Sequence, residues 1–395
     1  MKSRQYSKLG FLAVLVASAA GGCGGGSGEP PDAAVVNPVD AGMDGGHIVQ
    51  PKAPWFACSD TDVVGATVVA AHDHSHHYNA TRTIDATVDL PAGDWQQVLM
   101  RVELTCPADG FCDVWDRGAS LTLIEDEGDT KKRLELARYM TPYGRGFCFV
   151  ADVSDLASHL QGKKTIRSFI DTWVGPDDPH NGHGWGVTTS FIYRAGARDP
   201  GYASEVIPLW ENQGEERLVT IGDSGQPVAD ALPKRTVAIP ADAKKVKLRY
   251  IVTGHGQGGG DNCAEFCQLQ YRTSIGDQHL DVVPWRPDCD QNPVSPQGGT
   301  WRYARAGWCP GAYSAPHIVD ITDKVTPGTD ALLTFSVLDG SGAEFVNTCR
   351  PGAGDALNHC TGCTSDPAGA NNCDYNYNGH TQPEARISVD LLVYR

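Results

Sequence analysis

Short segments in which apolar and polar residues alternate recur along the chain, and they constrain the fold more than any other feature. In the segment 83–90, Ile84 and its alternate neighbours are apolar, whereas Asp85 and its alternate neighbours are polar or acidic. A period of two residues is typical of a β-strand with one face in a core. The pattern returns at 246–252, 333–337 and 387–393. With 45 glycines and 25 prolines, which favour turns, it predicts an all-β protein.

The length of 395 residues predicts two domains, because single hydrophobic cores usually stop growing at roughly 250 to 300 residues. The short polar stretch 197–204 fits a boundary between them. We expect a signal peptide at 1–22, a flexible Gly/Pro-rich linker at 23–54, an N-terminal domain at 55–198, and a C-terminal domain at 199–395 with a cysteine-rich insertion at 346–376. Two sandwiches side by side would leave a cleft, where ligand sites are common.

The acidic balance of the chain argues against a nucleic-acid partner. Forty-eight acidic against 32 basic residues give a net charge of −16, which a phosphate backbone would repel. Beyond the first two dozen residues, no segment approaches the roughly 18 to 20 apolar residues that span a bilayer. We therefore expect a mature protein with no membrane-spanning segment and no nucleic acid.

The N-terminus has the features of an export signal. Lys2, Arg4 and Lys8 precede an apolar run at 9–20 that is too short for a membrane span. The sequence Ala-Gly-Gly-Cys that ends at Cys23 resembles a lipoprotein cleavage box, which would attach a lipid anchor to this cysteine. The alternative is ordinary secretion after cleavage at Ala-Ser-Ala, residues 17–19. We expect an exported protein, either lipid-anchored to the bacterial outer membrane or secreted or periplasmic.

The 13 cysteines also fit export, since lipidation of Cys23 would leave an even number for disulfides. Cys349, Cys360, Cys363 and Cys373 form a cluster that contains a C-x-x-C motif. In a cytosolic protein this motif would suggest zinc, whereas an oxidising compartment favours two disulfides.

Two acidic residues lie in or beside very short cysteine loops. Asp116 closely follows the loop 106–112, and Glu265 lies inside the loop 263–267. Closing a loop of about five residues contributes on the order of 2 kcal/mol in the chain-entropy model, so such a bridge mainly fixes local geometry. Rigid placement suits a catalytic acid. Spacing alone, however, fits equally well with disulfides that only stabilise turns in an exported protein.

Five segments give these acids a context. They are 106–117, which ends in Cys-Asp-Val-Trp-Asp-Arg, then 138–143 (Arg-Tyr-Met-Thr-Pro-Tyr), 171–173 (Asp-Thr-Trp), 263–267 (Cys-Ala-Glu-Phe-Cys) and 305–311 (Arg-Ala-Gly-Trp-Cys-Pro-Gly). In this order, across residues 80–345, they resemble the peptide-N-glycosidase F family. Members of that family detach N-linked glycans by hydrolysing the side-chain amide of asparagine.

The resemblance implies a fold and a set of site residues. The family fold is a pair of eight-stranded antiparallel jelly-roll β-sandwiches with the active site in the groove between them. The family's catalytic acids fall on Asp116, Glu265 and Asp171. Positions that line the cleft fall on Arg117, Arg305, Trp173, Trp308 and His255. The family's disulfides fall on Cys106 with Cys112, Cys263 with Cys267, and Cys289 with Cys309, which leaves Cys58 and Cys148 to pair.

The implied chemistry uses carboxylates and arginines, with no metal or other cofactor. Amide hydrolysis needs an activated water, a stabilised oxyanion and a proton for the departing amine. In this interpretation Asp116 deprotonates the water and Glu265 holds the shared proton, because burial beside another carboxylate raises proton affinity. Arg117 and Arg305 would polarise the carbonyl or bind the first sugar. The implied substrates are N-glycosylated peptides and proteins, and we expect a monomer.

Departures from the family pattern concern substrate choice more than reaction type. Asp171 is one methylene shorter than the family's glutamate, so its carboxylate should fall about 1 Å or more short, and Asp171→Glu is expected to retain or improve activity. His255 stands where the family has tryptophan, in a shorter glycine-rich turn. Trp173 and Trp308 would give flat walls for sugar rings, each with an indole N–H as a polar handle.

Two other functions stay open. Copper-dependent peptidyl hydroxylating monooxygenases share the double jelly-roll fold, and the histidine tract 72–77, or His180 and His183, could supply metal ligands. We expect the tract to be a solvated loop instead. A non-catalytic glycan-binding module is the second alternative, because a shared fold does not decide function.

Overall fold

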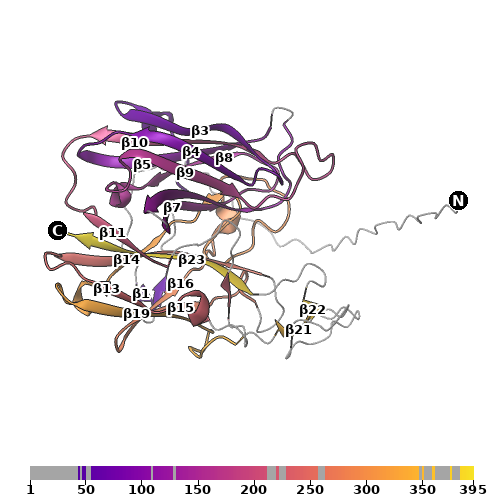
Figure 1. Ribbon diagram of the computed structural model, residues 1–395. Coiled ribbons are helices and arrows are strands. Elements are labelled where there is room, and N and C mark those ends of the chain that lie inside the picture. Colours follow the sequence, from indigo (N-terminus) through magenta and orange to yellow (C-terminus); the bar gives the residue numbers. More distant parts are fainter. Residues whose placement is uncertain are drawn as a thin grey trace, which may run out of the picture. The chain divides into compact units, whose positions relative to one another are not determined.

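The structure is a computed structural model of the chain, and strands make up most of its regular secondary structure (Figure 1). It describes residues 43–44, 47–49, 55–107, 110–127, 130–210, 219–221, 228–256, 263–346, 349–350, 358–360, 374–375 and 383–395. The predicted signal peptide, Cys23 and most of the predicted linker lie outside these residues. Within the described ranges, no helix has the length and apolar character needed to cross a membrane.

Strands β3 to β10 form the first sandwich. One sheet has the order β3-β10-β5-β8, and the other has the order β7-β6-β9-β4, with the short strand β17 (Ala312–Tyr313) added beside β7. The bounds are Thr67–His77 (β3), Thr83–Leu90 (β4), Trp95–Thr105 (β5), Gly118–Glu127 (β6), Thr130–Met140 (β7), Phe147–Asp152 (β8), Gly162–Ile170 (β9) and Trp185–Ala195 (β10).

The second sandwich is built from β11 onward. Its sheets have the orders β11-β23-β14-β18 and β16-β15-β19-β13, and β1, β2 and β12 extend them. The main strands are Glu205–Trp210 (β11), Arg235–Ala238 (β13), Lys245–His255 (β14), Gln270–Ile275 (β15), Gln278–Val283 (β16), His317–Asp320 (β18), Asp330–Leu338 (β19) and Glu384–Tyr394 (β23).

The remaining described elements are short. The added strands are Met43–Asp44 (β1), His47–Val49 (β2) and Val219–Thr220 (β12), and Cys349–Arg350 (β20), Asn358–Cys360 (β21) and Asp374–Tyr375 (β22) form a separate small sheet. The helical turns are Asp60–Val63, Ser154–Leu156, Val228–Ala231 (α1), Cys289–Gln291 and Thr322–Lys324.

Both sandwiches have the same topology. When the eight main strands of each are numbered in chain order, the two sheets of each sandwich have the orders 1-8-3-6 and 5-4-7-2, which is the jelly-roll arrangement. The pairing is antiparallel, except that β2 lies parallel to β16 among the described strands. The prediction of an all-β fold with two jelly-roll sandwiches is therefore confirmed. The change from one sandwich to the next falls between β10 and β11.

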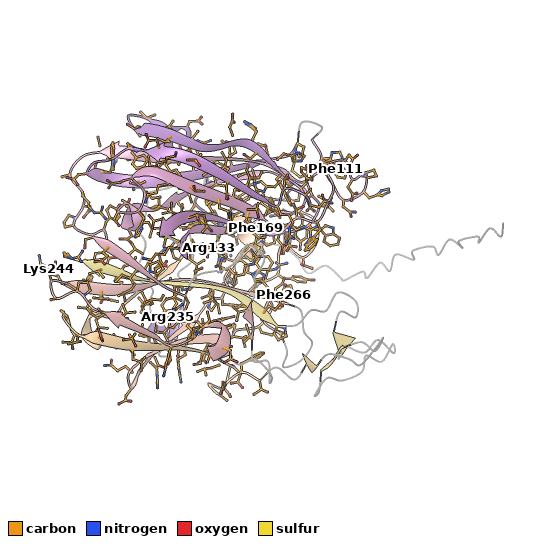
Figure 2. The ribbon with its side chains drawn as sticks, viewed as in Figure 1. Phe111, Arg133, Phe169, Arg235, Lys244 and Phe266 are labelled. Atoms are coloured by element: carbon orange, nitrogen blue, oxygen red, sulfur yellow. A yellow bond between two sulfur atoms is a disulfide. The ribbon has the colours of Figure 1, made fainter. Side chains whose placement is uncertain are left out.

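The alternating segments behave in two different ways. In β4, Asp85, Thr87 and Asp89 are exposed while Val88 and Leu90 are buried, as expected for a strand with one solvated face. In β23, the alternate polar residues Arg386, Ser388 and Asp390 are buried as well, each 2 to 3% exposed. Side chains fill the interior of each sandwich (Figure 2), and the polar face of β23 packs against the first sandwich.

A buried ionic network joins the two sandwiches. Arg138 of β7 donates from Nη1 to the carbonyl oxygens of Arg386 (2.6 Å) and Ile251 (3.1 Å), and from Nε to Glu135 (2.8 Å). Arg249 of β14 donates from Nη1 to the Glu135 carbonyl at 3.0 Å. Breaking a buried pair of this kind typically costs about 3 to 5 kcal/mol, so the network fixes how the two halves meet.

Four disulfides lie among the described residues. Cys106 bonds Cys112, Cys263 bonds Cys267, and Cys289 bonds Cys309, as the resemblance implies. Cys58 and Cys148 form the fourth, which ties the segment before β3 to strand β8. The pairing predicted for Cys349, Cys360, Cys363 and Cys373 lies outside the described side chains.

Candidate active site

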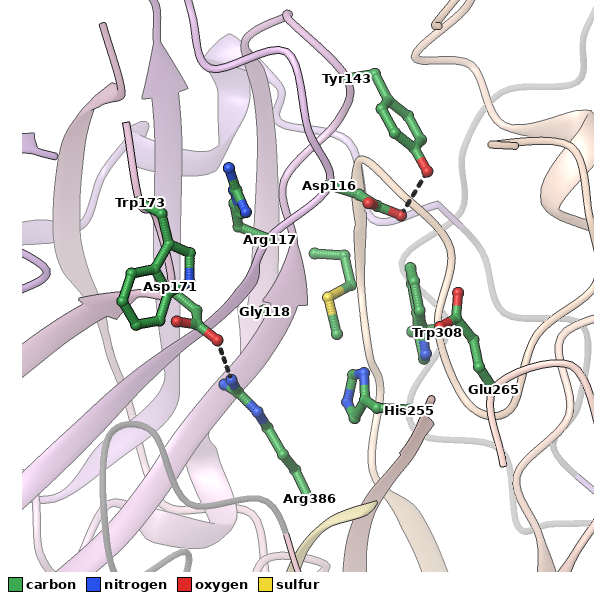
Figure 3. A pocket seen from close by; sticks show the side chains of 11 residues that line it. Asp116, Arg117, Gly118, Tyr143, Asp171, Trp173, His255, Glu265, Trp308 and Arg386 are labelled. Carbon is green, nitrogen blue, oxygen red and sulfur yellow. Dashed lines mark hydrogen bonds and ion pairs between the residues drawn. The ribbon is translucent and has the colours of Figure 1, made fainter. Parts of the chain in front are cut away.

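A pocket of about 210 Å³ is lined by both sandwiches (Figure 3). A single water needs only about 10 to 15 Å³ on such a measure, so the pocket has room for several waters or for part of a ligand. The first sandwich contributes Asp116, Arg117, Gly118, Met140, Tyr143, Asp171 and Trp173, and the second contributes His255, Glu265, Trp308 and Arg386. The structure thus brings the three acids singled out in the sequence into one hollow.

A loop organised around the buried Asp113 carries Asp116. The Asp113 carboxylate accepts hydrogen bonds from Arg117 Nε (2.9 Å), from Thr172 Oγ1 (2.8 Å) and from the backbone N–H of Trp115 (3.0 Å). The disulfide of the 106–112 loop lies just before this acid. Asp113 therefore fixes the turn from which Asp116 and Arg117 reach the pocket.

A chain of directed hydrogen bonds ends on Asp116. Arg305 Nη2 donates to Thr300 Oγ1 (2.7 Å), so the Thr300 hydroxyl is free to donate to Tyr143 (3.3 Å). The Tyr143 hydroxyl in turn donates to Asp116 Oδ2 at 2.8 Å. Gly299 makes this approach possible, since a side chain there would begin 2.5 Å from the Tyr143 ring. One oxygen of Asp116 is therefore held by the protein.

Glu265 comes from a short stiffened loop of the second sandwich. The disulfide of the 263–267 loop closes around it, and its backbone N–H donates to the Gly256 carbonyl at 3.1 Å. Its own carbonyl accepts from the backbone N–H of Ala306 at 2.9 Å. The carboxylate accepts from Arg305 Nε at 3.1 Å, while Arg305 Nη2 lies 3.7 Å from Asp116. One guanidinium thus bridges the two acids.

Burial raises the proton affinity of both acids. Removal from water raises the pKa of Asp116, although Arg305 and the Tyr143 hydrogen bond oppose this. Burial also raises the pKa of Glu265 to about 7, against the attraction of Arg305 and with help from the negative charge of Asp116. Two coupled carboxyls with proton affinities shifted toward neutral pH can divide the roles of base and acid.

Arg305 is committed to the protein and does not line the pocket. It is fully buried, donates from Nη1 to the Thr300 carbonyl at 2.9 Å, and lies over the rings of Phe266 (5.0 Å) and Trp308 (4.6 Å). Trp308 is 3% exposed, and its indole N–H donates to the Gly254 carbonyl at 2.8 Å. Contrary to expectation, Trp308 therefore offers the pocket a ring but no polar handle, and Arg305 positions the acids.

His255 is neutral, and its contacts define its tautomer. Burial lowers its pKa well below the ordinary value, and nearby arginines add to this effect. Arg138 Nη1 donates to Thr253 Oγ1 (3.2 Å), which leaves the Thr253 hydrogen to be donated to His255 Nε2 (2.9 Å). The imidazole then carries its proton on Nδ1. His255 also stacks on Trp308, with ring centroids 5.6 Å apart.

Asp171 is held between two arginines from different sandwiches. Arg82 contacts Oδ1, and Arg386 Nη2 lies 3.3 Å from Oδ2. The backbone N–H of Asp171 donates to the Gly118 carbonyl at 3.0 Å. Trp173 is 62% exposed and lies against the Arg82 guanidinium at 4.1 Å. Although Asp171 is one methylene shorter than a glutamate, its carboxylate therefore reaches two guanidinium groups.

Several residues of the site were not anticipated from the sequence. Asp113 and Tyr143 lie within matching segments, so their positions carried a signal although their roles did not. Thr300, Arg82 and Arg386 lie outside those segments and reach the site only through long-range packing. Nothing in their local sequence distinguishes them from surface residues.

The histidine tract is not the solvated loop that we expected. It forms part of β3, in which His72 and His77 are 2% and 0% exposed. Burial lowers the pKa of both, that of His77 to about 4. His76 Nε2 contacts the His183 carbonyl at 2.6 Å, and His74 is exposed. Among the described side chains, no three histidine, cysteine or acidic groups are gathered as a metal site.

Fold and site together define a class: double jelly-roll proteins with an acid-rich pocket at the junction of the two sandwiches. Comparisons with known proteins find similarity to one family of this class. Residues 227–347 match the family model described as "Peptide-N-glycosidase F, C terminal". Peptide-N(4)-(N-acetyl-beta-D-glucosaminyl)asparagine amidase F of Elizabethkingia miricola is 27% identical over 275 residues, which cover 65% of this chain and 71% of the relative.

Solved structures agree in fold. The structure of PNGase F, a glycosylasparaginase from Flavobacterium meningosepticum, superposes with a TM-score of 0.64 at 20% identity, over 83% of this chain and 96% of that one. The structure of PNGF-II has a TM-score of 0.61 at 15% identity, over 84% of this chain and 65% of that one. In sequence and in fold the chain is therefore similar to the peptide-N-glycosidase F family.

Proposed function

We propose that this protein hydrolyses the amide bond between an N-linked glycan and an asparagine side chain, which leaves an aspartate in the peptide. The observation that carries the proposal is the pair of buried acids, Asp116 and Glu265, which come from separate sandwiches into one pocket and share Arg305. The asparagine amidase that is 27% identical to this chain supports the same assignment.

The first step is attack of a water on the side-chain amide carbon. Tyr143 holds one oxygen of Asp116, and the other oxygen is left to accept a proton from that water. The new C–O bond moves an electron pair onto the carbonyl oxygen. We assign Arg117 to stabilise this oxyanion, because it lines the pocket and its side chain is 18% exposed, whereas Arg305 is fully buried.

The second step breaks the C–N bond. Glu265, whose pKa is raised by burial to about 7, can hold a proton near neutral pH and deliver it to the departing nitrogen. The products are an aspartate side chain and a glycosylamine, which reacts with water and loses ammonia. The proton that Asp116 gained then returns to Glu265 or to solvent, and the site is restored.

A glycopeptide incubated in heavy-oxygen water tests the proposal by mass spectrometry. Cleavage should convert the glycosylated asparagine to aspartate with one heavy oxygen and release the complete glycan. Asp116→Asn should lower the rate by about 100- to 10,000-fold, which is the usual contribution of general acid–base catalysis. Asp89→Asn is the matched control, since Asp89 is an exposed acid of β4. A sugar left on asparagine, or full activity in Asp116→Asn, would contradict the proposal.

A further inference from the structure

Two histidine-rich segments that the proposed reaction leaves unused meet beside the Asp116 loop, residues 111–117. The first is the end of strand β3, which contains His76, and the second is the histidine loop, residues 178–184, which leads into β10. His76 Nε2 lies 2.6 Å from the carbonyl oxygen of His183. A carbonyl oxygen only accepts, so Nε2 carries a hydrogen and donates it. A side chain of β3 is thus tied to the backbone of the histidine loop.

The histidine loop in turn holds the Asp116 loop through backbone hydrogen bonds. Three such bonds join the two loops: from the Val114 N–H to the Asn181 carbonyl (3.0 Å), from the Asp113 N–H to the Gly184 carbonyl (3.2 Å), and from the His183 N–H to the Phe111 carbonyl (2.9 Å). The disulfide that ends at Cys112 fixes the same stretch from its other side. The position of the Asp116 loop therefore depends on the position of the histidine loop.

Two glycines allow the histidine loop to lie this close to its neighbours. A Cβ atom on Gly182 would lie 1.9 Å from the carbonyl oxygen of Cys112, and one on Gly184 would lie 1.9 Å from the carbonyl oxygen of His77. Their φ angles of +88° and +86° also fall in the left-handed region that favours glycine. Because backbone approaches backbone on both sides, the loop has little room to move separately from β3 or from the Asp116 loop.

His76 itself is held firmly on β3. Its ring centroid lies 5.0 Å from that of Tyr78, and its carbonyl accepts from Thr81 Oγ1 at 2.7 Å. On the other side of the contact, the ring of His183 lies edge-on to that of Phe111, with centroids 5.4 Å apart. The donor on His76 is therefore fixed before it meets the histidine loop, as a support requires.

The supported stretch leads directly to the acid that activates water. Asp116 follows Asp113 by three residues, and the Asp113 carboxylate holds the turn between them. The Asp113 carbonyl also accepts from the N–H of Gly144 at 3.0 Å, one residue after Tyr143, whose hydroxyl donates to Asp116. A shift of Asp113 would therefore disturb both the acid and its donor. A misplacement of about 1 Å can lower a rate by about 100-fold.

We propose that His76 is a positioning residue for the hydrolysis, which acts through the histidine loop to fix Asp116 in the pocket. This inference rests on the proposed function for its kinetic consequence, whereas its structural consequence can be measured without a substrate. The histidine-rich end of β3 then has a role in the reaction, although His76 touches neither the substrate nor the reacting atoms.

Steady-state kinetics with a glycopeptide test the kinetic consequence. His76→Phe removes the donor and keeps a ring beside Tyr78, so kcat should fall by about 10-fold, whereas KM should stay unchanged because the pocket residues of the second sandwich keep their places. His76→Gln carries an amide N–H at the same reach and should restore kcat. His74→Asn is the matched control, since His74 is an exposed histidine of the same strand and asparagine tolerates its positive φ. It should leave both constants unchanged.

Hydrogen exchange of the same full-length variants tests the structural consequence. In His76→Phe the backbone N–H groups of Asp113 and Val114 should exchange about 2- to 10-fold faster than in the wild type, the effect of losing one hydrogen bond. In His76→Gln and His74→Asn they should exchange at the wild-type rate. Unchanged exchange or unchanged kcat in His76→Phe, a loss that appears in KM alone, or no rescue by glutamine overturns the proposal. Faster exchange in His76→Phe, combined with a wild type that cleaves no glycopeptide, would refute the hydrolase and confirm the support of the Asp116 loop.

Discussion

Glu265 should make the folded protein less stable as pH rises from about 4.5 to about 7, and Glu265→Gln should remove this effect. Glu265 is 9% exposed, and burial raises the pKa of its carboxyl group from 4.5 to about 7. Between these values the folded protein keeps a proton that the unfolded chain has released. The folded state therefore binds more protons, and stability falls as pH increases across the window from 4.5 to about 7.

The size of the effect follows from the two pKa values. Each pKa unit corresponds to about 1.4 kcal/mol, so a rise from 4.5 to about 7 amounts to roughly 3 kcal/mol. Glutamine keeps an acceptor oxygen for Arg305 Nε but cannot ionise. Part of this effect lies below pH 5, so relative to wild type Glu265→Gln should gain about 2.5 kcal/mol in free energy of unfolding between pH 5 and pH 8.

Urea unfolding of both proteins at the two pH values measures this difference. Glu125→Gln serves as a control of opposite sign: burial alone would raise the pKa of Glu125, but hydrogen bonds from Lys164 and His159 outweigh burial and lower it. That carboxylate stabilises the fold above its unfolded pKa, so its removal should lower stability at both pH 5 and pH 8. If Glu265→Gln shows the same pH dependence as wild type, Glu265 does not hold a proton in the folded protein, and the assigned acid role fails with it.

Two further substitutions test the contacts of the other acids. Asp171→Glu adds about 1.5 Å of side chain against Arg82 and Arg386, so the contacts in the structure argue for a loss of activity where the sequence suggested none. The value of kcat/KM for a glycopeptide should fall by about 10- to 100-fold. Wild-type activity would mean that the two arginines move to accommodate the longer side chain. In the wild type the hydrogen bond from Tyr143 lowers the pKa of Asp116, and Tyr143→Phe removes it. The pKa of Asp116 should then rise, so the rate should fall by about 10- to 100-fold and the acid limb of the pH–rate profile should move to higher pH. An acid limb that does not move would exclude Asp116 as the titrating base.

The fold was readable from the sequence where a strand faces water on one side. In β4 the polar positions are exposed, and the period of two reports burial directly. In β23 the same period was misleading about exposure, because the polar residues Arg386, Ser388 and Asp390 face another sandwich. An alternating sequence pattern shows that the two faces of a strand differ in polarity. It does not show whether the polar face is exposed to solvent or packs against a second polar surface.

The site was readable where rigidity is encoded locally. The cysteine loop just before Asp116 and the one that contains Glu265 are visible in the cysteine spacing, and the structure brings both acids into one pocket. Arg82 and Arg386 were missed because their role depends on the register of strands far apart in the chain. The histidine tract was misjudged for a related reason: its composition suggested a loop, but pairing with β10 makes it a strand.

The two sandwiches are needed together for any of this chemistry. Arg138 of the first sandwich binds the carbonyl of Arg386 and, through Thr253, fixes the ring of His255, so one buried arginine orients two pocket residues of the second sandwich. Arg305 of the second sandwich acts in the opposite direction on Asp116. Because each half supplies the contacts that hold the other half's site residues, the pocket exists only in the joined form. The buried polar junction is therefore the feature that places the two acids, and its desolvation gives them their raised proton affinity.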